Sequence, residues 1–318
     1  MGASFAAALL PPLALLVITV VLLQLAWLGM VQYGPGFLTS SIWDQVRLQF
    51  GALPYIFGTV VTAAIALILA VPVGIGVALF LAEPGQAGFR SVIGTGVELL
   101  AAIPSVVYGL WALFVMGPFV YKALELPISS RLGFLALFAG TPRPTSLLSA
   151  GLVLAVMVLP TMAAVSRDVI QAVPGGLKEA SVALGATWWE TTWRVILPAA
   201  RPGIFGATIL ALGRALGETI AVTMIIGNRP QVSTHIFEPA YTLAAVIANE
   251  FTEATTPLHT AALIELGLIL NALTLTITLL ALALLRALQC TRGRRAPALP
   301  SRNTNRAGAR VHRRAICA

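Results

Sequence analysis

Six long apolar runs, separated by polar segments, constrain this chain more than any other feature of its sequence. They occupy residues 6–31, 53–81, 92–120, 147–165, 204–226 and 261–285. About 20 apolar residues in a helix cross the hydrocarbon of a bilayer, and a backbone in lipid has to satisfy its hydrogen bonds internally. The runs therefore predict an all-α, polytopic membrane protein with six transmembrane helices.

The composition supports a membrane protein and argues against nucleic-acid binding. Only 10% of the 318 residues are charged and the mean hydropathy is +0.90, whereas a soluble domain carries about 25% charged residues. The C-terminal segment 289–318 holds eight of the twenty lysines and arginines behind the net charge of +8. No aromatic platform accompanies these arginines, so we expect a basic anchor beside the membrane and no nucleic-acid partner.

The distribution of basic residues predicts the orientation of the chain. When six helices cross the bilayer, loop 168–201 lies on the same side as the arginine-rich tail, and Arg90 in the short loop after the second run joins them. The opposite side holds five basic residues, and five acidic residues on that side offset their charge. The positive-inside rule therefore predicts a multi-pass protein with both termini and loop 168–201 in the cytoplasm.

Arg214 and Glu218 are the most informative ionisable residues, because both lie inside the fifth run. Their spacing of four residues predicts that they share one face of a helix. Charges inside a span are costly unless they are paired or face a wet cavity. One interpretation is a structural ion pair that docks this helix on a neighbour. The favoured one places both on a transport path, where the guanidinium binds an oxyanion and Glu218 orients it.

Several other residues receive structural interpretations. Glu98 and Glu265 lie nearer the ends of their runs, where a charged side chain reaches the interface at lower cost. Gly213 and Gly217 have the spacing at which small residues let two helices approach closely. His259 lies in an outer-side segment without a partner at metal-ligand spacing, so we expect a surface residue and no metal site.

Loop 168–201 is predicted to form two short amphipathic helices, divided at 174–176 and at Gly185. Its apolar packing groups are Leu177, Val182, Leu184, Trp188, Trp189 and Trp193. They suit a groove on a cytoplasmic partner and equally a headgroup layer on which the helices lie. From these side chains alone, neither interpretation is favoured.

Part of this loop resembles the EAA loop of ABC importer permeases. The residues that match the motif at its spacing are Glu179, Ala180, Gly185, Leu197 and Pro198. Ser181 stands where the motif has its second alanine. The segments 98–111, 213–223, 248–254 and 258–270 resemble the PstC-type permease of the phosphate-specific ABC importer. The resemblance extends over residues 50–285, nearly all of the membrane region.

This resemblance implies a type I ABC importer permease fold and a division of the chain into three parts. Residues 1–49 would hold the first transmembrane helix and an outer-side segment, residues 50–288 the permease core, and residues 289–318 a disordered cytoplasmic tail. Arg214 and Glu218 match the charged pair that is associated with phosphate passage. The five EAA-like residues would form the contact with an ATP-binding subunit.

The resemblance also implies an assembly in the cytoplasmic membrane of a bacterium or archaeon. This chain would pair with a PstA-like permease, and two copies of an ATP-binding subunit would lie beneath them and carry the ATP and Mg²⁺. A phosphate-binding protein would dock on the outer side. The permease chain itself would need no cofactor.

Three other functions are weighed against phosphate import. A permease for another oxyanion, such as sulfate or molybdate, would share the fold and the loop. A secondary transporter would need coupling-ion sites and no such loop. An intramembrane enzyme would need a nucleophile and a base at depth, and the sequence has no Walker A pattern, nucleophile elbow or His-Glu-x-x-His motif. We therefore expect a transport subunit that is not itself an enzyme.

Overall fold

A computed structural model describes residues 2–82 and 87–295 of the chain. In these residues every regular element is a helix, and the only β-type contact is an isolated bridge between Asp44 and Gln49. Six helical segments are long and apolar enough to cross a membrane, which confirms the predicted class. They are Ala7–Tyr33, Leu53–Ala82, Ser105–Leu132, Leu147–Gln171, Trp188–Gly217 and Pro257–Arg286.

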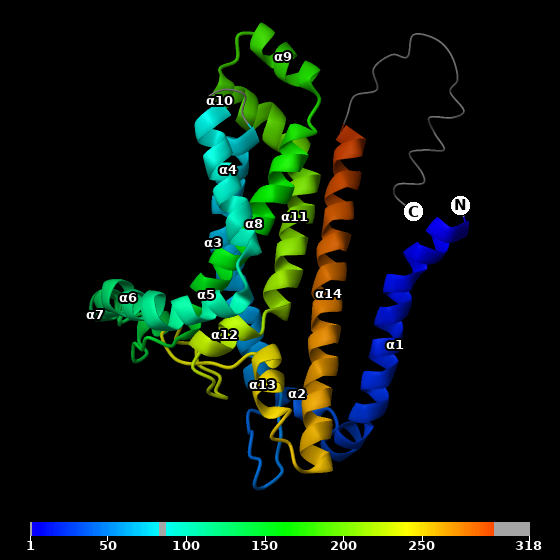
Figure 1. Cartoon of the computed structure of the whole chain (residues 1–318), viewed down its shortest axis with the longest axis vertical. Helices are drawn as coiled ribbons and strands as arrows, with labels where there is room; N and C mark the ends of the chain where they lie inside the picture. The colour runs from blue at the N-terminus through cyan, green and yellow to red at the C-terminus, as the bar shows by residue number, and fades with distance from the viewer. Residues whose placement is uncertain (1, 83–86, 296–318) are drawn as a thin grey trace.

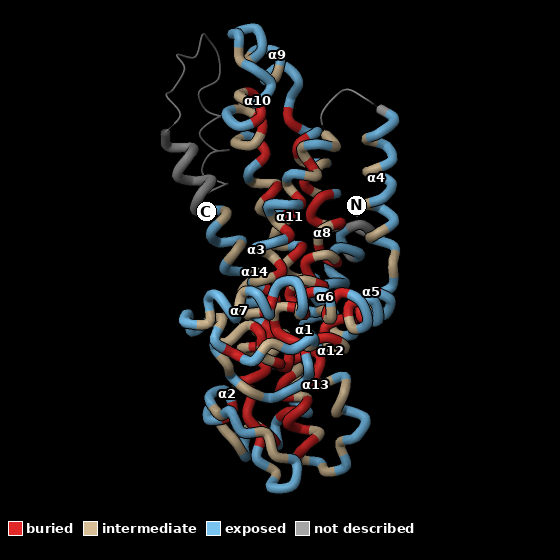
Figure 2. Tube along the Cα trace, turned by 90° about the vertical axis from the view of Figure 1, so that its left-hand side faces the viewer, coloured by how far each residue is buried: buried red, intermediate tan, exposed pale blue. Residues whose placement is uncertain are grey.

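Three helices form the centre of the molecule: α3 (Leu53–Ala82), α8 (Leu147–Gln171) and α11 (Leu197–Gly217). Buried residues follow this central axis in Figure 2. Between helices in lipid, close packing of small residues takes the place of the hydrophobic effect. A Cβ added at Gly151 of α8 would lie 2.5 Å from Ile65 Cγ2 of α3, so glycine is required for the two helices to lie this close.

Two long helices, α1 (Gly2–Tyr33) and α14 (Pro257–Arg295), form a pair beside this centre (Figure 1). The side-chain amide of Asn271 donates a 2.8 Å hydrogen bond to Thr19 Oγ1 across the pair. The start of α1 and the end of α14 both point toward the end of the molecule that carries α9 (Gly175–Ala183), in Figure 1. The remainder of the predicted tail, residues 296–318, lies outside the described residues.

The third apolar run differs from the single span that we predicted for residues 92–120. α4 (Ala87–Ala102) ends before Pro104, and α5 (Ser105–Trp111) begins there in a new direction. Proline lacks an N–H and disfavours the helical conformation in the residue before it, so the helix stops although the apolar pattern continues. Further helical segments follow α5: η1 (Ala112–Met116), α6 (Gly117–Val120), η2 (Tyr121–Glu125) and α7 (Leu126–Leu132). This part extends sideways from the central helices in Figure 1.

The end of the molecule opposite α9 is formed by α2 (Gly36–Thr39), α13 (Leu243–Glu250) and their loops. His259 is buried there, with its ring stacked on Phe50 at 5.1 Å and its Nε2 3.3 Å from a Glu250 carboxylate oxygen. The prediction that His259 is a surface residue is wrong. Glu250 lies only nine residues away, but Phe50, on which the ring stacks, comes from a distant part of the sequence, so spacing along the chain did not reveal the burial.

Candidate functional site

The fifth span ends at Gly217, earlier than the predicted boundary at residue 226. Glu218 follows it with φ −71° and ψ 126°, an extended conformation, and a separate short helix, α12 (Ile220–Ile225), comes next. Ala221 and Val222 are 0% and 1% exposed. Burial of α12 against α5 and α8 therefore draws the chain away from the axis of α11.

This break separates Arg214 from Glu218. Arg214 lies in the last turn of α11, whereas Glu218 lies beyond the helix, so the prediction that they share a helical face is wrong. Glu218 Oε1 instead accepts a 3.4 Å hydrogen bond from the Ala221 amide in the first turn of α12. Among the residues that the structure describes, no ion pair joins the two. Glu218 thus contacts the backbone at the break.

Arg214 lies on a face of α11 that this chain leaves open. Its side chain is exposed, and a Cβ placed at Gly213 or Gly217 would meet no atom within 4 Å. The two glycines therefore mediate no close helix contact within the described chain, contrary to our interpretation. No carboxylate within residues 2–82 and 87–295 pairs with this guanidinium, which lies beside open space and can therefore bind an anion with oxygen atoms.

Tyr108 is a neighbour of this site to which sequence reasoning assigned no role. It lies close enough to Arg214 for an electrostatic interaction, and its hydroxyl donates a 2.8 Å hydrogen bond to the Leu100 carbonyl. A Cβ at the adjacent Gly109 would lie 3.1 Å from Ala221 Cα, so α5 and α12 pack closely here. The sequence offered one sign of this neighbour, because Tyr108 is a tyrosine next to a glycine within an apolar run.

Loop 168–201 forms the far end of the molecule, where α9 projects from the bundle (Figure 1). Gly185 ends the α9 segment with φ +84°, a conformation that favours glycine. Thr187 and Glu190 then form a reciprocal capping box at the start of α10 (Trp188–Thr191). α10 continues through η4 (Thr192–Ile196) into α11, so the second predicted helix is the first part of the fifth span.

The five EAA-like residues fall into two groups in space. Glu179 and Ala180 on α9, together with Gly185 after it, are exposed. Leu197 and Pro198 are half-buried in the first turn of α11. Ser181 joins α9 to the start of the fifth span, because its hydroxyl lies 3.0 Å from that of Thr191 on α10, which is 3% exposed.

The apolar side chains of this loop lie in two different places in the structure. Val182 and Leu184, at the end of α9, are 59% and 89% exposed. The three tryptophans lie instead at the start of the fifth span, with Trp189 and Trp193 rings 5.6 Å apart. An exposed apolar group on a projecting helix is typical of a protein contact, whereas tryptophans at a span end are typical of the membrane interface.

No group of His, Cys, Asp and Glu within residues 2–82 and 87–295 is arranged to hold a metal ion. Arg214 at the break and the exposed surface of α9 are the candidate functional features at the two ends of the fifth span.

Comparisons with known proteins show which family this chain resembles. The family described as the binding-protein-dependent transport system inner membrane component matches residues 70–289. The phosphate transport system permease protein PstC of Mesorhizobium japonicum is 47% identical over 84% of this chain and 83% of its own length. The protein of the same name from Haemophilus influenzae is 43% identical over 85% of this chain and 86% of its own length.

Solved structures show the same fold at low sequence identity. A bacterial alginate ABC transporter chain superposes with a TM-score of 0.57 at 19% identity and covers 87% of this chain and 92% of its own. A chain of the inward-facing MetNI methionine ABC transporter superposes with a TM-score of 0.55 at 19% sequence identity. The match covers 77% of this chain and 99% of the transporter chain. This chain therefore belongs to the family of binding-protein-dependent transport system inner membrane components, in its PstC-type branch.

Proposed function

We propose that this chain is the permease subunit that moves inorganic phosphate inward through the cytoplasmic membrane in an ATP-driven importer. Its relatives at 42–47% identity are phosphate transport permeases. The observation within the chain that carries the proposal is Arg214, an exposed cation at the break between α11 and α12. A planar guanidinium donates two parallel hydrogen bonds to phosphate oxygens.

The helix break suits binding followed by release. Arg214 has no carboxylate partner among the described residues, so its donors are available to the substrate. Glu218 holds the first turn of α12 and thereby fixes the shape of the break around the arginine. We place both residues on the phosphate path. Arg214 binds the phosphate, and Glu218 positions the backbone of the break around Arg214. Alternating access requires the two states to bind phosphate with different affinity.

The opposite end of the fifth span supports coupling to ATP hydrolysis on another chain. The exposed apolar end of α9 fits a groove on an ATP-binding subunit. Glu179, Ala180 and Gly185 would contact that subunit. Leu197 and Pro198 would pass the movement into α11, which ends at the phosphate site. In this proposal ATP and Mg²⁺ are bound by two copies of the partner.

The remaining surfaces suit two further partners. The open face of α11 around Gly213 and Gly217 is proposed to meet a PstA-like permease across the substrate path. A phosphate-binding protein is proposed to dock on the end opposite α9. This orientation places α9 and both termini in the cytoplasm, in agreement with the basic residues of loop 168–201.

Uptake of radiolabelled phosphate by cells that lack their own high-affinity permease tests the proposal. The chain is expressed with its partner subunits as wild type and as Arg214→Gln. A charged hydrogen bond contributes about 1.5–3 kcal/mol, so we expect Arg214→Gln to lower uptake by about tenfold or more. Arg229→Gln, an exposed outer-side arginine, serves as the matched control and should transport normally.

The same cells are tested with sulfate and molybdate. Sulfate or molybdate uptake without phosphate uptake would reassign the substrate within the oxyanions. Full phosphate uptake by Arg214→Gln in an assembled complex would remove Arg214 from the path. Uptake that persists without the ATP-binding subunit would indicate a secondary transporter.

A further inference from the structure

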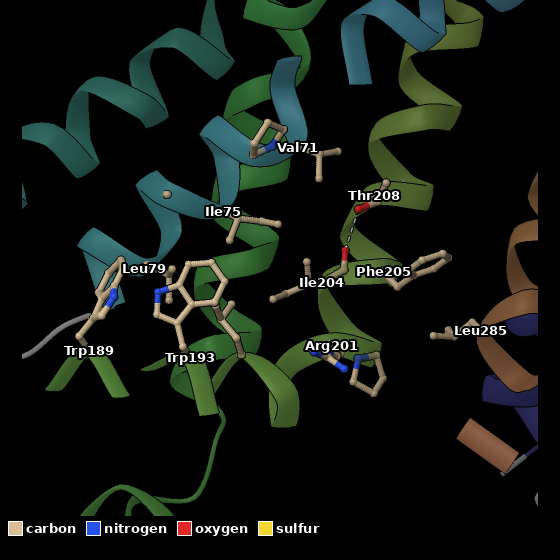
Figure 3. A pocket seen from close by; sticks show the side chains of 14 residues that line it. Val71, Ile75, Leu79, Trp189, Trp193, Arg201, Ile204, Phe205, Thr208 and Leu285 are labelled. Atoms are coloured by element: carbon tan, nitrogen blue, oxygen red, sulfur yellow. Dashed lines mark hydrogen bonds between the residues drawn. The ribbon is translucent and has the colours of Figure 1, made fainter. Parts of the chain in front are cut away.

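A groove of about 880 Å³ opens between three helices near the end of the molecule that carries α9 (Figure 3). Val71, Ile75 and Leu79 of α3 line one side, Ile204 and Phe205 of α11 another, and Leu285 of α14 the third. The volume lies within the range of about 300–1,000 Å³ that is typical of small-molecule sites. This groove is separate from the Arg214 site.

One end of the groove is polar and the rest is apolar. Trp189, Trp193 and Arg201 lie together at one end in Figure 3, and Arg201 is the only charged side chain among the lining residues. At the other end, Thr208 donates its hydroxyl to the Ile204 carbonyl of its own helix over 3.0 Å. That end therefore offers no free hydroxyl donor, and its surface is effectively hydrocarbon.

The polar end has donors that no described residue uses. Within residues 2–82 and 87–295, no carboxylate pairs with Arg201 and no acceptor receives the indole N–H of Trp189 or Trp193. Indole and guanidinium groups at the end of a span are typical of the lipid headgroup level. A ligand that satisfies them has an anionic oxygen-rich head.

The dimensions of the groove fit the other half of such a ligand. From Val71 to Leu79 the α3 axis rises about 12 Å at 1.5 Å per residue. One leaflet of a bilayer contributes about 15 Å of hydrocarbon. The apolar surface thus extends over most of one leaflet, directly below the cationic end.

We propose that this groove is a binding site for one anionic phospholipid, with an acyl chain against α3, α11 and α14 and its phosphate on Arg201 and the two indoles. Anionic headgroups attract basic pockets between transmembrane helices on the cytoplasmic side. The site lies at the base of the α9 loop, because Trp189 and Trp193 belong to the segment that joins this loop to α11. A lipid bound there supports the start of the fifth span.

Native mass spectrometry of the assembled importer tests the site without relying on transport. The complex is purified with its partner subunits and exposed to mixed micelles of phosphatidylglycerol and phosphatidylcholine. Wild type should retain phosphatidylglycerol preferentially. Arg201→Gln should reduce that preference by about fivefold, the contribution of about one basic residue near an anionic surface. Arg194→Gln, an exposed arginine of the same loop outside the groove, should retain it.

A second pair of variants tests the groove itself. Gly76 lines it, and a Cβ there meets no atom within 4 Å, so Gly76→Phe fits the fold and fills the space. Gly96→Phe, on α4, is the matched control because Gly96 has equal room outside the groove. Loss of retained lipid in Gly76→Phe alone supports the site.

Two results would overturn the proposal. The first is an unchanged preference for phosphatidylglycerol in Arg201→Gln, or unchanged retention in Gly76→Phe. The second is a disulfide, formed with an added oxidant in the assembled complex, between Gly76→Cys and a cysteine introduced into a membrane helix of the partner permease, since that helix would then occupy the groove.

Discussion

The two ends of the fifth span differ in how the helix is joined to the rest of the chain. At the α9 end, a capping box and a continuous run through α10 and η4 lead into α11 without a break. At the other end the helix stops at Gly217, and Glu218 turns the chain into α12. In the proposed function the first end transmits movement along the helix, whereas the second presents the exposed Arg214. The fifth span thus connects the surface that we propose for the ATP-binding subunit to the site that we propose for phosphate.

The largest effect is expected at the contact surface. Leu184→Asp places a charge on a side chain that is 89% exposed, so the permease should fold normally while the apolar contact is lost. An apolar anchor at the centre of an interface contributes about 2 kcal/mol or more. We therefore expect the ATP-binding subunit to be lost from the purified complex and uptake to be abolished.

Val46→Asp is the control for this experiment, because Val46 is 92% exposed in the segment between α2 and α3, and α2 lies at the end of the molecule opposite α9 (Figure 1). The ATP-binding subunit should still copurify with Val46→Asp. Retention of that subunit by Leu184→Asp as well would show that the α9 end is not the contact.

An intermediate effect is expected at the break. Glu218→Gln retains an oxygen that accepts from the Ala221 amide, so we expect uptake to fall by only about threefold, less than for a lost charged hydrogen bond. Because no ion pair joins the two side chains, the effects of Glu218→Gln and Arg214→Gln should add in a double-mutant cycle. Strong non-additivity in the uptake rates would show that the two residues pair during transport.

The smallest effect is expected from the Ser181–Thr191 contact between α9 and the span. A hydrogen bond between neutral groups contributes about 1 kcal/mol, so Ser181→Ala should raise local opening of α9 by about fivefold while transport persists. Hydrogen exchange at α9 amides measures this. Thr191→Val should give the same increase, and the double variant no more. Additive increases would mean that the two hydroxyls act separately.

The sequence predicts the parts of this molecule that depend on local pattern. The apolar runs identify six membrane-spanning segments because each run is about as long as a bilayer requires, or longer. Pro174 and Gly185 also mark the bounds of α9 correctly, through backbone preferences that act within a few residues. The capping box of Thr187 and Glu190 is equally local.

What could not be predicted depends on tertiary packing. The apolar pattern continues through Gly217 to Ile226, so it does not show that burial of Ala221 and Val222 against α5 breaks the helix. The separation of Arg214 from Glu218 follows from that break. His259 was misplaced for a similar reason, since Phe50 lies far from it in the chain.

The most direct test of the account is whether water and phosphate reach the open face of α11 in the assembled importer. Gly217→Cys places a thiol one turn from Arg214, where a Cβ meets no atom within 4 Å. Cys290 and Cys317 are replaced by serine, and reaction with a water-soluble methanethiosulfonate is followed, because only a hydrated thiolate reacts. If phosphate passes along this face, the thiol should react, and phosphate but not chloride should slow the reaction. A thiol that stays unreactive, or reacts equally fast with phosphate present, would contradict a phosphate path along this face.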